Sequence, residues 1–178
     1  MVTVVPSGLG NDFSYTLLTA THRQYFTLIP EDLSLAVRLG YQTVLSGNIP
    51  FFMLPHYQSS FRATEGLGGS KSLRGILKNR LVGESIGFGN LELRWKFLHT
   101  KLLGQNLYLA LNGFVDAGKV LEEYSWYDPD VEQSLHVSYG GGFRIALNEN
   151  FIVAVDFGLA ADELDGNSGL YIGLGYLF

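Results

Sequence analysis

Ser168-Gly-Leu-Tyr-Ile-Gly-Leu-Gly-Tyr-Leu-Phe178 alternates large apolar residues with mostly small ones. Side chains of a β-strand point to opposite faces with a period of two. One face of this stretch therefore carries five large apolar side chains: Leu170, Ile172, Leu174, Tyr176 and Phe178. Such a face is too apolar for the frayed edge of a soluble sheet, whereas in a transmembrane barrel it would contact lipid. The stretch predicts a lipid-facing strand over residues 168–178.

The same alternation recurs upstream and predicts seven antiparallel strands. They cover residues 12–28, 33–43, 87–98, 107–119, 134–147, 151–160 and 168–178. Short connections, near 29–32, 99–106 and 148–150, alternate with longer ones at 44–86, 121–133 and 162–168. Outer-membrane barrels show this asymmetry between short periplasmic turns and long external loops. The fold class we expect is all-β, an antiparallel transmembrane β-barrel located in the bacterial outer membrane.

Composition supports a single domain whose outer face does not meet water. The 178 residues include 22 Gly, 12 Phe and 10 Tyr, and only 16% are charged, against about a quarter in soluble domains. The absence of cysteine excludes disulfides and thiolate metal sites. The net charge of -5 argues against nucleic acid as a partner.

The connection over residues 44–86 is too long for a hairpin and is therefore a candidate functional loop. It contains Leu73-Arg-Gly-Ile76, and here the chain resembles the BamA/TamA family of outer-membrane assembly factors, the bacterial surface antigen superfamily. In that family the sixth external loop folds back into the lumen and carries an apolar-Arg-Gly-aromatic motif at its tip. Leu73, Arg74 and Gly75 match this motif, and Ile76 stands where Phe or Tyr is usual.

Three further motifs follow in the family's order. Gly89–Arg94 resembles strand twelve, Gly113–Gly118 resembles the Phe-x-Asp-x-Gly of strand thirteen, and Gly140–Arg144 resembles the Gly-x-Gly-x-Arg of strand fourteen. The five strands after the loop agree with a sixteen-stranded family barrel. The resemblance implies that residues 1–178 are the C-terminal seven or so strands of such a barrel, with periplasmic POTRA modules or a lipase possible upstream. A complete small barrel of about eight strands is the alternative, but its filled interior would not house the long loop.

Five residues form the candidate site, which we call the loop lock: Leu73, Arg74, Gly75, Glu92 and Asp116. By the period-two argument, Glu92 and Asp116 face the lumen from the two strands after the loop. A charge-assisted contact from Arg74 to either carboxylate would fix the loop tip, with Leu73 and Gly75 beside it. The alternative is an Arg74 that lies in solvent on a mobile loop. Four other inward charged residues are interpreted as generic lumen polarity: Arg38, Arg94, Arg144 and Asp156.

A second candidate lies at the end of the sequence. Gly173, Tyr176 and Phe178 resemble the signal that ends bacterial outer-membrane barrels, although Ile172 stands where a polar residue is usual. We expect Phe178 to act in assembly of the chain itself. Gly173 and Gly175 would also weaken pairing of the last strand, because glycine lowers strand stability.

No enzyme, cofactor or metal site is predicted. Gly113–Val120 nearly matches a phosphate-binding loop, but Val120 replaces the Ser or Thr that binds magnesium, and the segment lies in a strand. The four histidines lack ligand-like spacing. The resemblance implies assembly or translocation of other outer-membrane proteins, with lipid, unfolded outer-membrane proteins and the barrel assembly machinery as partners. The alternative is a passive structural or pore barrel, or the anchor of a missing domain such as a patatin-type lipase.

Overall fold

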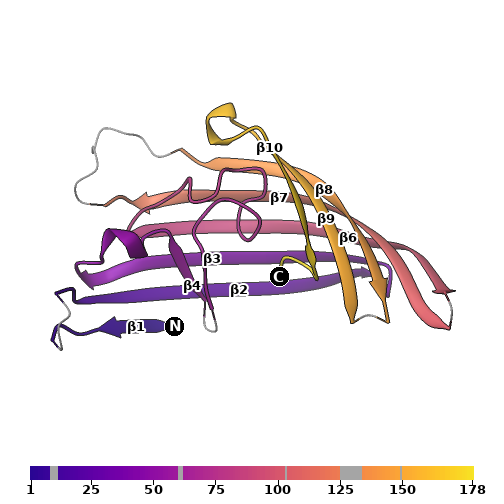
Figure 1. The fold of residues 1–178 in the computed structure, drawn as a ribbon, viewed down its shortest axis with the longest axis horizontal. Helices are drawn as coiled ribbons and strands as arrows, with labels where there is room; N and C mark the ends of the chain where they lie inside the picture. The colour runs from indigo at the N-terminus through magenta and orange to yellow at the C-terminus, as the bar shows by residue number, and fades with distance from the viewer. Residues whose placement is uncertain (9–11, 60–61, 103, 125–133, 149) are drawn as a thin grey trace.

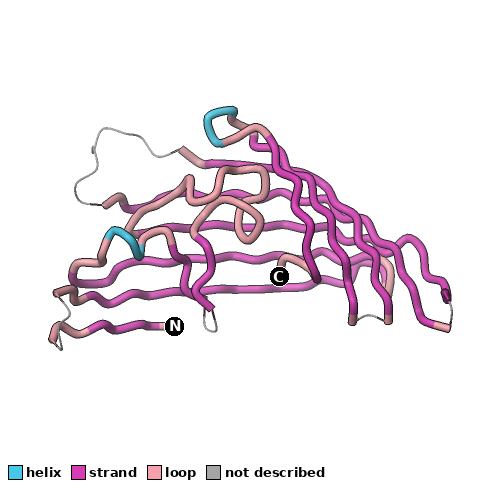
Figure 2. Tube along the Cα trace, viewed as in Figure 1, coloured by secondary structure: helices cyan, strands magenta, loops and turns pink. Residues whose placement is uncertain are grey.

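The computed structural model describes residues 1–8, 12–59, 62–102, 104–124, 134–148 and 150–178. Eight antiparallel strands form one curved sheet in the order β1-β2-β3-β6-β7-β8-β9-β10 (Figure 1). Their bounds are β1 Val2–Val5, β2 Tyr15–Ile29, β3 Leu33–Gly47, β6 Ser85–Leu102, β7 Gln105–Glu122, β8 His136–Leu147, β9 Phe151–Ala160 and β10 Ser168–Leu174. The expected all-β antiparallel fold is confirmed, and Figure 2 shows how strands dominate the chain.

The remaining elements are small. A hairpin of β4 (His56–Ser59) and β5 (Arg62–Glu65) forms a second sheet within the long loop. Two 3₁₀ helices, η1 (Phe51–Met53) and η2 (Glu163–Asp165), lie in connections. Within the described part of the chain, no helix combines the length and the apolar character that a membrane span requires.

The strands differ from the expected ones in several places, of which two concern the number of strands and their connections. β1 is an additional strand that pairs with β2. β6 and β7 also continue through most of residues 99–106, where a connection was expected. A register shift between Lys96 and Leu98 explains the second difference, since a bulge interrupts the period-two pattern. Part of the expected loop 121–133 lies outside the described residues.

The two faces of the sheet have opposite character. Large apolar side chains such as Leu91, Trp95 and Leu111 are exposed on the outer face. On the inner face, polar side chains are buried beneath the long loop, which lies against the sheet in Figure 1. Apolar residues of the loop also pack onto β6 and β7, in a cluster of Tyr57, Leu67, Leu73, Ile76, Leu81, Ile86, Phe88 and Val120.

The expected course of the last strand is wrong at its end. Leu170, Ile172 and Leu174 are exposed on the outer face as expected, but β10 stops at Leu174 instead of Phe178. Gly175 has a φ of 85°, which interrupts the extended backbone and hence the alternation of faces. Tyr176 and Phe178 consequently contact the inner-face side chain of Arg94, and neither ring belongs to the lipid-facing set.

Candidate functional site

Arg74 lies at the buried tip of the long loop and is 1% exposed. Its Nε donates to Asp116 Oδ2 at 2.9 Å, and its Nη2 donates to Asp116 Oδ1 at 3.0 Å. The main-chain N–H of Arg74 also donates to Asp116 Oδ2, at 3.0 Å. The two side-chain hydrogen bonds form a bidentate pair between the guanidinium and the carboxylate. Such charge-assisted pairs are stronger than hydrogen bonds between neutral side chains. Asp116 of β7 therefore holds both the side chain and the backbone of the tip.

Glu92 of β6 completes the charge balance around Arg74. Arg74 Nη1 donates to Glu92 Oε1 at 2.5 Å, and the guanidinium carbon lies 3.4 Å from the centre of the Phe114 ring. Burial alone would lower the pKa of Arg74, but hydrogen bonds and charges from Asp116 and Glu92 outweigh burial and raise this pKa above its ordinary value. Arg74 therefore stays charged throughout the physiological pH range.

A second set of contacts orients the carboxylate of Asp116 and the loop backbone. Asn90 Nδ2 donates to Asp116 Oδ1 at 2.7 Å and to the main-chain oxygen of Ser72 at 2.6 Å. Arg38 Nε donates to Asn90 Oδ1 at 2.8 Å, and Arg38 Nη2 donates to the main-chain oxygen of Lys71, also at 2.8 Å. β3 and β6 thus bind the backbone just before the tip, so the loop is held by more than one side chain.

Asp156 extends the network to β8 and β9. Arg144 Nη2 donates to Asp156 Oδ2 at 2.8 Å, and that oxygen lies 3.6 Å from Arg74 Nη1. Asn112 Nδ2 donates to Asp156 Oδ1 at 3.2 Å. Arg144 is fully buried and Asp156 nearly so. These residues are therefore specific members of the network, and their interpretation as generic lumen polarity is wrong.

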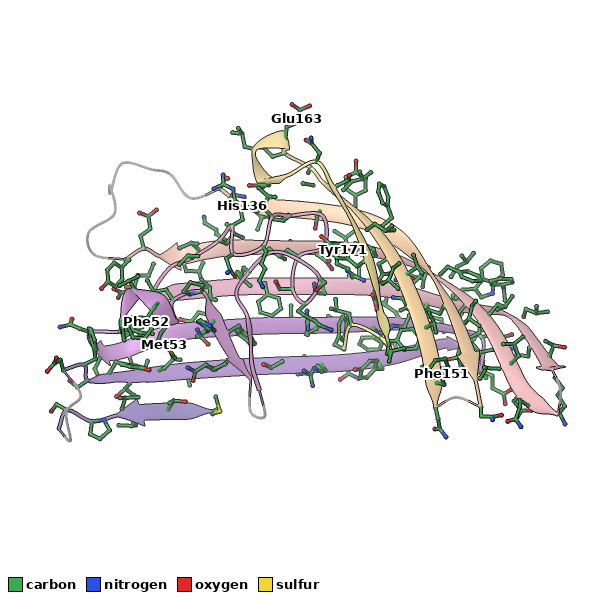
Figure 3. The ribbon with its side chains drawn as sticks, in the orientation of Figure 1. Phe52, Met53, His136, Phe151, Glu163 and Tyr171 are labelled. Atoms are coloured by element: carbon green, nitrogen blue, oxygen red, sulfur yellow. The ribbon has the colours of Figure 1, made fainter. Side chains whose placement is uncertain are left out.

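The backbone at the tip requires glycine. Gly75 has a φ of 94°, and a Cβ there would lie 2.8 Å from main-chain atoms of Leu159 in β9. The contact is equally close at Gly158 of β9, where an added Cβ would lie 2.8 Å from the carbonyl carbon of Arg74. The Gly75 N–H donates to the hydroxyl of Tyr171 at 2.9 Å, and Tyr171 is labelled on β10 in Figure 3. The tip therefore packs against β9 and bonds to β10.

Asp165 makes a separate junction between the loop, β8 and the β9–β10 connection. Its carboxylate lies 2.7 Å from His136 Nδ1 and 3.3 Å from Arg80 Nε. Its main-chain oxygen accepts a hydrogen bond from the Leu77 N–H at 2.8 Å. Figure 3 labels His136 at the start of β8 and Glu163 in the same connection as Asp165. We call Asp165, His136 and Arg80 the rim junction.

The structure brings together all five residues of the expected loop lock. Leu73 and Gly75 flank Arg74, and Glu92 and Asp116 bind its guanidinium. Sequence reasoning missed Phe114, Tyr171 and the rim junction, which depend on how distant segments cross. Sequence reasoning also assigned no role to Asn90, although its position two residues before Glu92 places it on the same face of the strand. Among the described residues no group of His, Cys, Asp and Glu side chains could hold a metal ion.

The arrangement is suited to fixing the position of the loop, because each carboxylate near Arg74 accepts hydrogen bonds from an arginine or an asparagine side chain. Comparison with known proteins agrees with the architecture. The family model described as the Omp85 superfamily domain matches residues 2–178. No curated protein and no solved structure matches the chain significantly.

Proposed function

The chain belongs to the Omp85 superfamily, and from this premise we propose that it is a barrel segment of a BamA/TamA-type factor that assembles or translocates other outer-membrane proteins. Superfamily proteins are outer-membrane β-barrels with roles in protein assembly and transport, and they are generally not enzymes. Its partners in this proposal are outer-membrane lipid, unfolded outer-membrane proteins and the barrel assembly machinery.

The observation that carries the proposal is the buried contact of Arg74 with Asp116 and Glu92. A passive pore needs an open lumen, whereas here a long loop is fixed across the inner face by charge-assisted hydrogen bonds. Removing one partner from a buried ion pair leaves an uncompensated charge, at a cost of about 3–5 kcal/mol. The loop lock would therefore keep the lumen occupied and the strands β6 to β9 in a fixed relation while other parts of the barrel move.

The moving part in this proposal is the outer edge of β10. β1 and β10 form the two edges of the described sheet, and the β10 edge is free to pair with a further strand. An unpaired strand edge offers main-chain donors and acceptors to incoming strands. A Cβ added at Gly173 of β10 would meet no atom within 4 Å, and the glycine itself contributes no side-chain packing to this edge. A weak edge suits reversible pairing with a substrate strand.

The test uses the full-length gene product in liposomes with an unfolded outer-membrane barrel as substrate. Folding of that substrate, measured by its heat-modifiable migration, should rise with the parent protein and fall strongly with Arg74→Ala. Arg23→Ala is the matched control, because Arg23 also lies on the inner face but is exposed. Ion conductance without any effect on substrate folding would favour the passive barrel instead.

A further inference from the structure

The residues that follow β10 turn back onto the inner face of the sheet. The Gly175 N–H donates to the main-chain oxygen of Ile152 at 2.9 Å, and the positive φ of Gly175 redirects the chain. Figure 1 shows the C-terminus in front of the sheet, on the side of the long loop. The structure thus places an aromatic segment, residues 175–178, among the inner-face arginines.

Arg94 of β6 is the central contact of this segment. Its Nη2 donates to the main-chain oxygen of Phe178 at 3.0 Å. Its guanidinium carbon lies 4.3 Å from the centre of the Tyr176 ring and 5.1 Å from that of Phe178. A guanidinium within about 6 Å of a ring centre is attracted by the negative face of the ring. Arg94 therefore binds the segment through both its backbone and its rings.

Other side chains complete the binding surface. The guanidinium of Arg38 lies 4.9 Å from the Phe178 ring, and that of Arg144 lies 5.5 Å from the Tyr176 ring. The ring of Tyr25 in β2 lies 6.4 Å from that of Phe178. The segment thus contacts side chains of β2, β3, β6 and β8, and of these strands only β8 is next to β9 in the order of the sheet.

Arg94 also connects this segment to the loop lock. Its Nε and Nη2 donate to Glu92 Oε2 at 2.8 and 2.6 Å, while the other oxygen of Glu92 accepts from Arg74. One carboxylate is therefore shared between the arginine that binds the loop tip and the arginine that binds residues 175–178. A change in the position of Arg94 alters the hydrogen bonding of Glu92, and hence the environment of Arg74.

We infer that Arg94 is a latch: it holds residues 175–178 on the inner face and couples their release to the loop tip through Glu92. The latch itself stands on the contacts of Arg94, and only its coupling to the loop rests on the proposed loop lock. A pocket of about 250 Å³ adjoins the latch, and its lining includes Arg94, Lys96 and Tyr176.

The test exploits the absence of cysteine from residues 1–178. Leu177→Cys places one thiol inside the latched segment, in the full-length protein in liposomes, and its reaction rate with a water-soluble maleimide reports release. Adding Arg94→Gln should raise this rate about tenfold, the loss expected for one charge-assisted hydrogen bond with its ring contacts. Arg23→Gln, the matched control on the same face, should leave the rate unchanged. Equal rates in Leu177→Cys alone and in Leu177→Cys combined with Arg94→Gln would overturn the latch.

A second readout separates the latch from its coupling. Cleavage of the long loop by a nonspecific protease should accelerate in Arg94→Gln, because Glu92 loses one of its two arginines. Phe178→Leu removes the ring contacts to Arg94 and Arg38 but keeps the Arg94–Glu92 pair. It should free the thiol at position 177 and, through the coupling, accelerate loop cleavage less than Arg94→Gln does. If Arg94→Gln does not insert into the membrane, Phe178→Leu provides the comparison of maleimide reaction rates at position 177 instead. A faster thiol with unchanged loop cleavage would overturn the coupling alone, and rapid loop cleavage in the parent would overturn the loop lock but not the latch.

Discussion

The guanidinium of Arg74 and the carboxylate of Asp116 form two side-chain hydrogen bonds, of 2.9 Å from Nε and 3.0 Å from Nη2, at the buried tip of the long loop. Both residues are at most 1% exposed. Because Asp116 also accepts the Arg74 N–H, the contact determines the position of the loop backbone as well as that of the side chain.

Replacing Arg74 should therefore separate the effect of charge from that of geometry. Arg74→Ala leaves Asp116 and Glu92 without their shared cation, and the loop should become readily cleaved by a nonspecific protease. Arg74→Lys should recover only part of the protection, because a single ammonium cannot donate to both carboxylates in the geometry of the guanidinium fork. Equal protection with lysine and arginine would show that charge alone holds the loop.

Gly75 should be intolerant of a side chain for two reasons. Gly75→Ala adds a Cβ at 2.8 Å from the backbone of Leu159, in addition to the strain of a positive φ. Gly104→Ala is the matched control, since Gly104 has a φ of 79° but meets no atom within 4 Å. Only Gly75→Ala should increase protease cleavage of the loop, while Gly104→Ala should cost about 1 kcal/mol of strain in its hairpin. Similar behaviour of the two variants would argue against close packing of the tip on β9.

The rim junction should hold the loop independently of its tip. Asp165→Asn removes the carboxylate charge that faces His136 and Arg80, and a buried carboxylate that contacts both side chains should not be replaced without loss of stability. Hydrogen exchange should then increase at residues 77–81 and leave the amide of Arg74 protected. Glu163→Gln, an exposed substitution in the same connection, is the control and should change neither region.

Phe178 remains a predicted assembly signal, although its ring lies on the inner face. Deleting Phe178 should lower membrane insertion far more than it lowers expression, because the residue contributes contacts to Arg94, Arg38 and Tyr25. Heat-modifiable migration of the inserted fraction measures this difference. Unchanged insertion after the deletion would reject the signal, whatever its effect on the latch.

Local alternation of side chains predicted much of this arrangement. Glu92 and Asp116 could be assigned to the inner face because both strands keep a strict period of two around them. The end of β10 could not be predicted in the same way, since the positive φ of Gly175 interrupts that period without changing the sequence pattern. Contacts such as Tyr171 with the Gly75 N–H also escaped prediction, because they depend on where β10 crosses the loop and not on local spacing.

A double-mutant cycle on Arg74 and Asp116 tests the loop lock most directly. The free energy of loop opening would be derived from protease cleavage of the parent, Arg74→Ala, Asp116→Ala and the double variant, under conditions where cleavage follows the open population. The loop lock predicts strong coupling, of about 2 kcal/mol or more, with the double variant little worse than either single one. Additive effects, within about 0.5 kcal/mol, would contradict it.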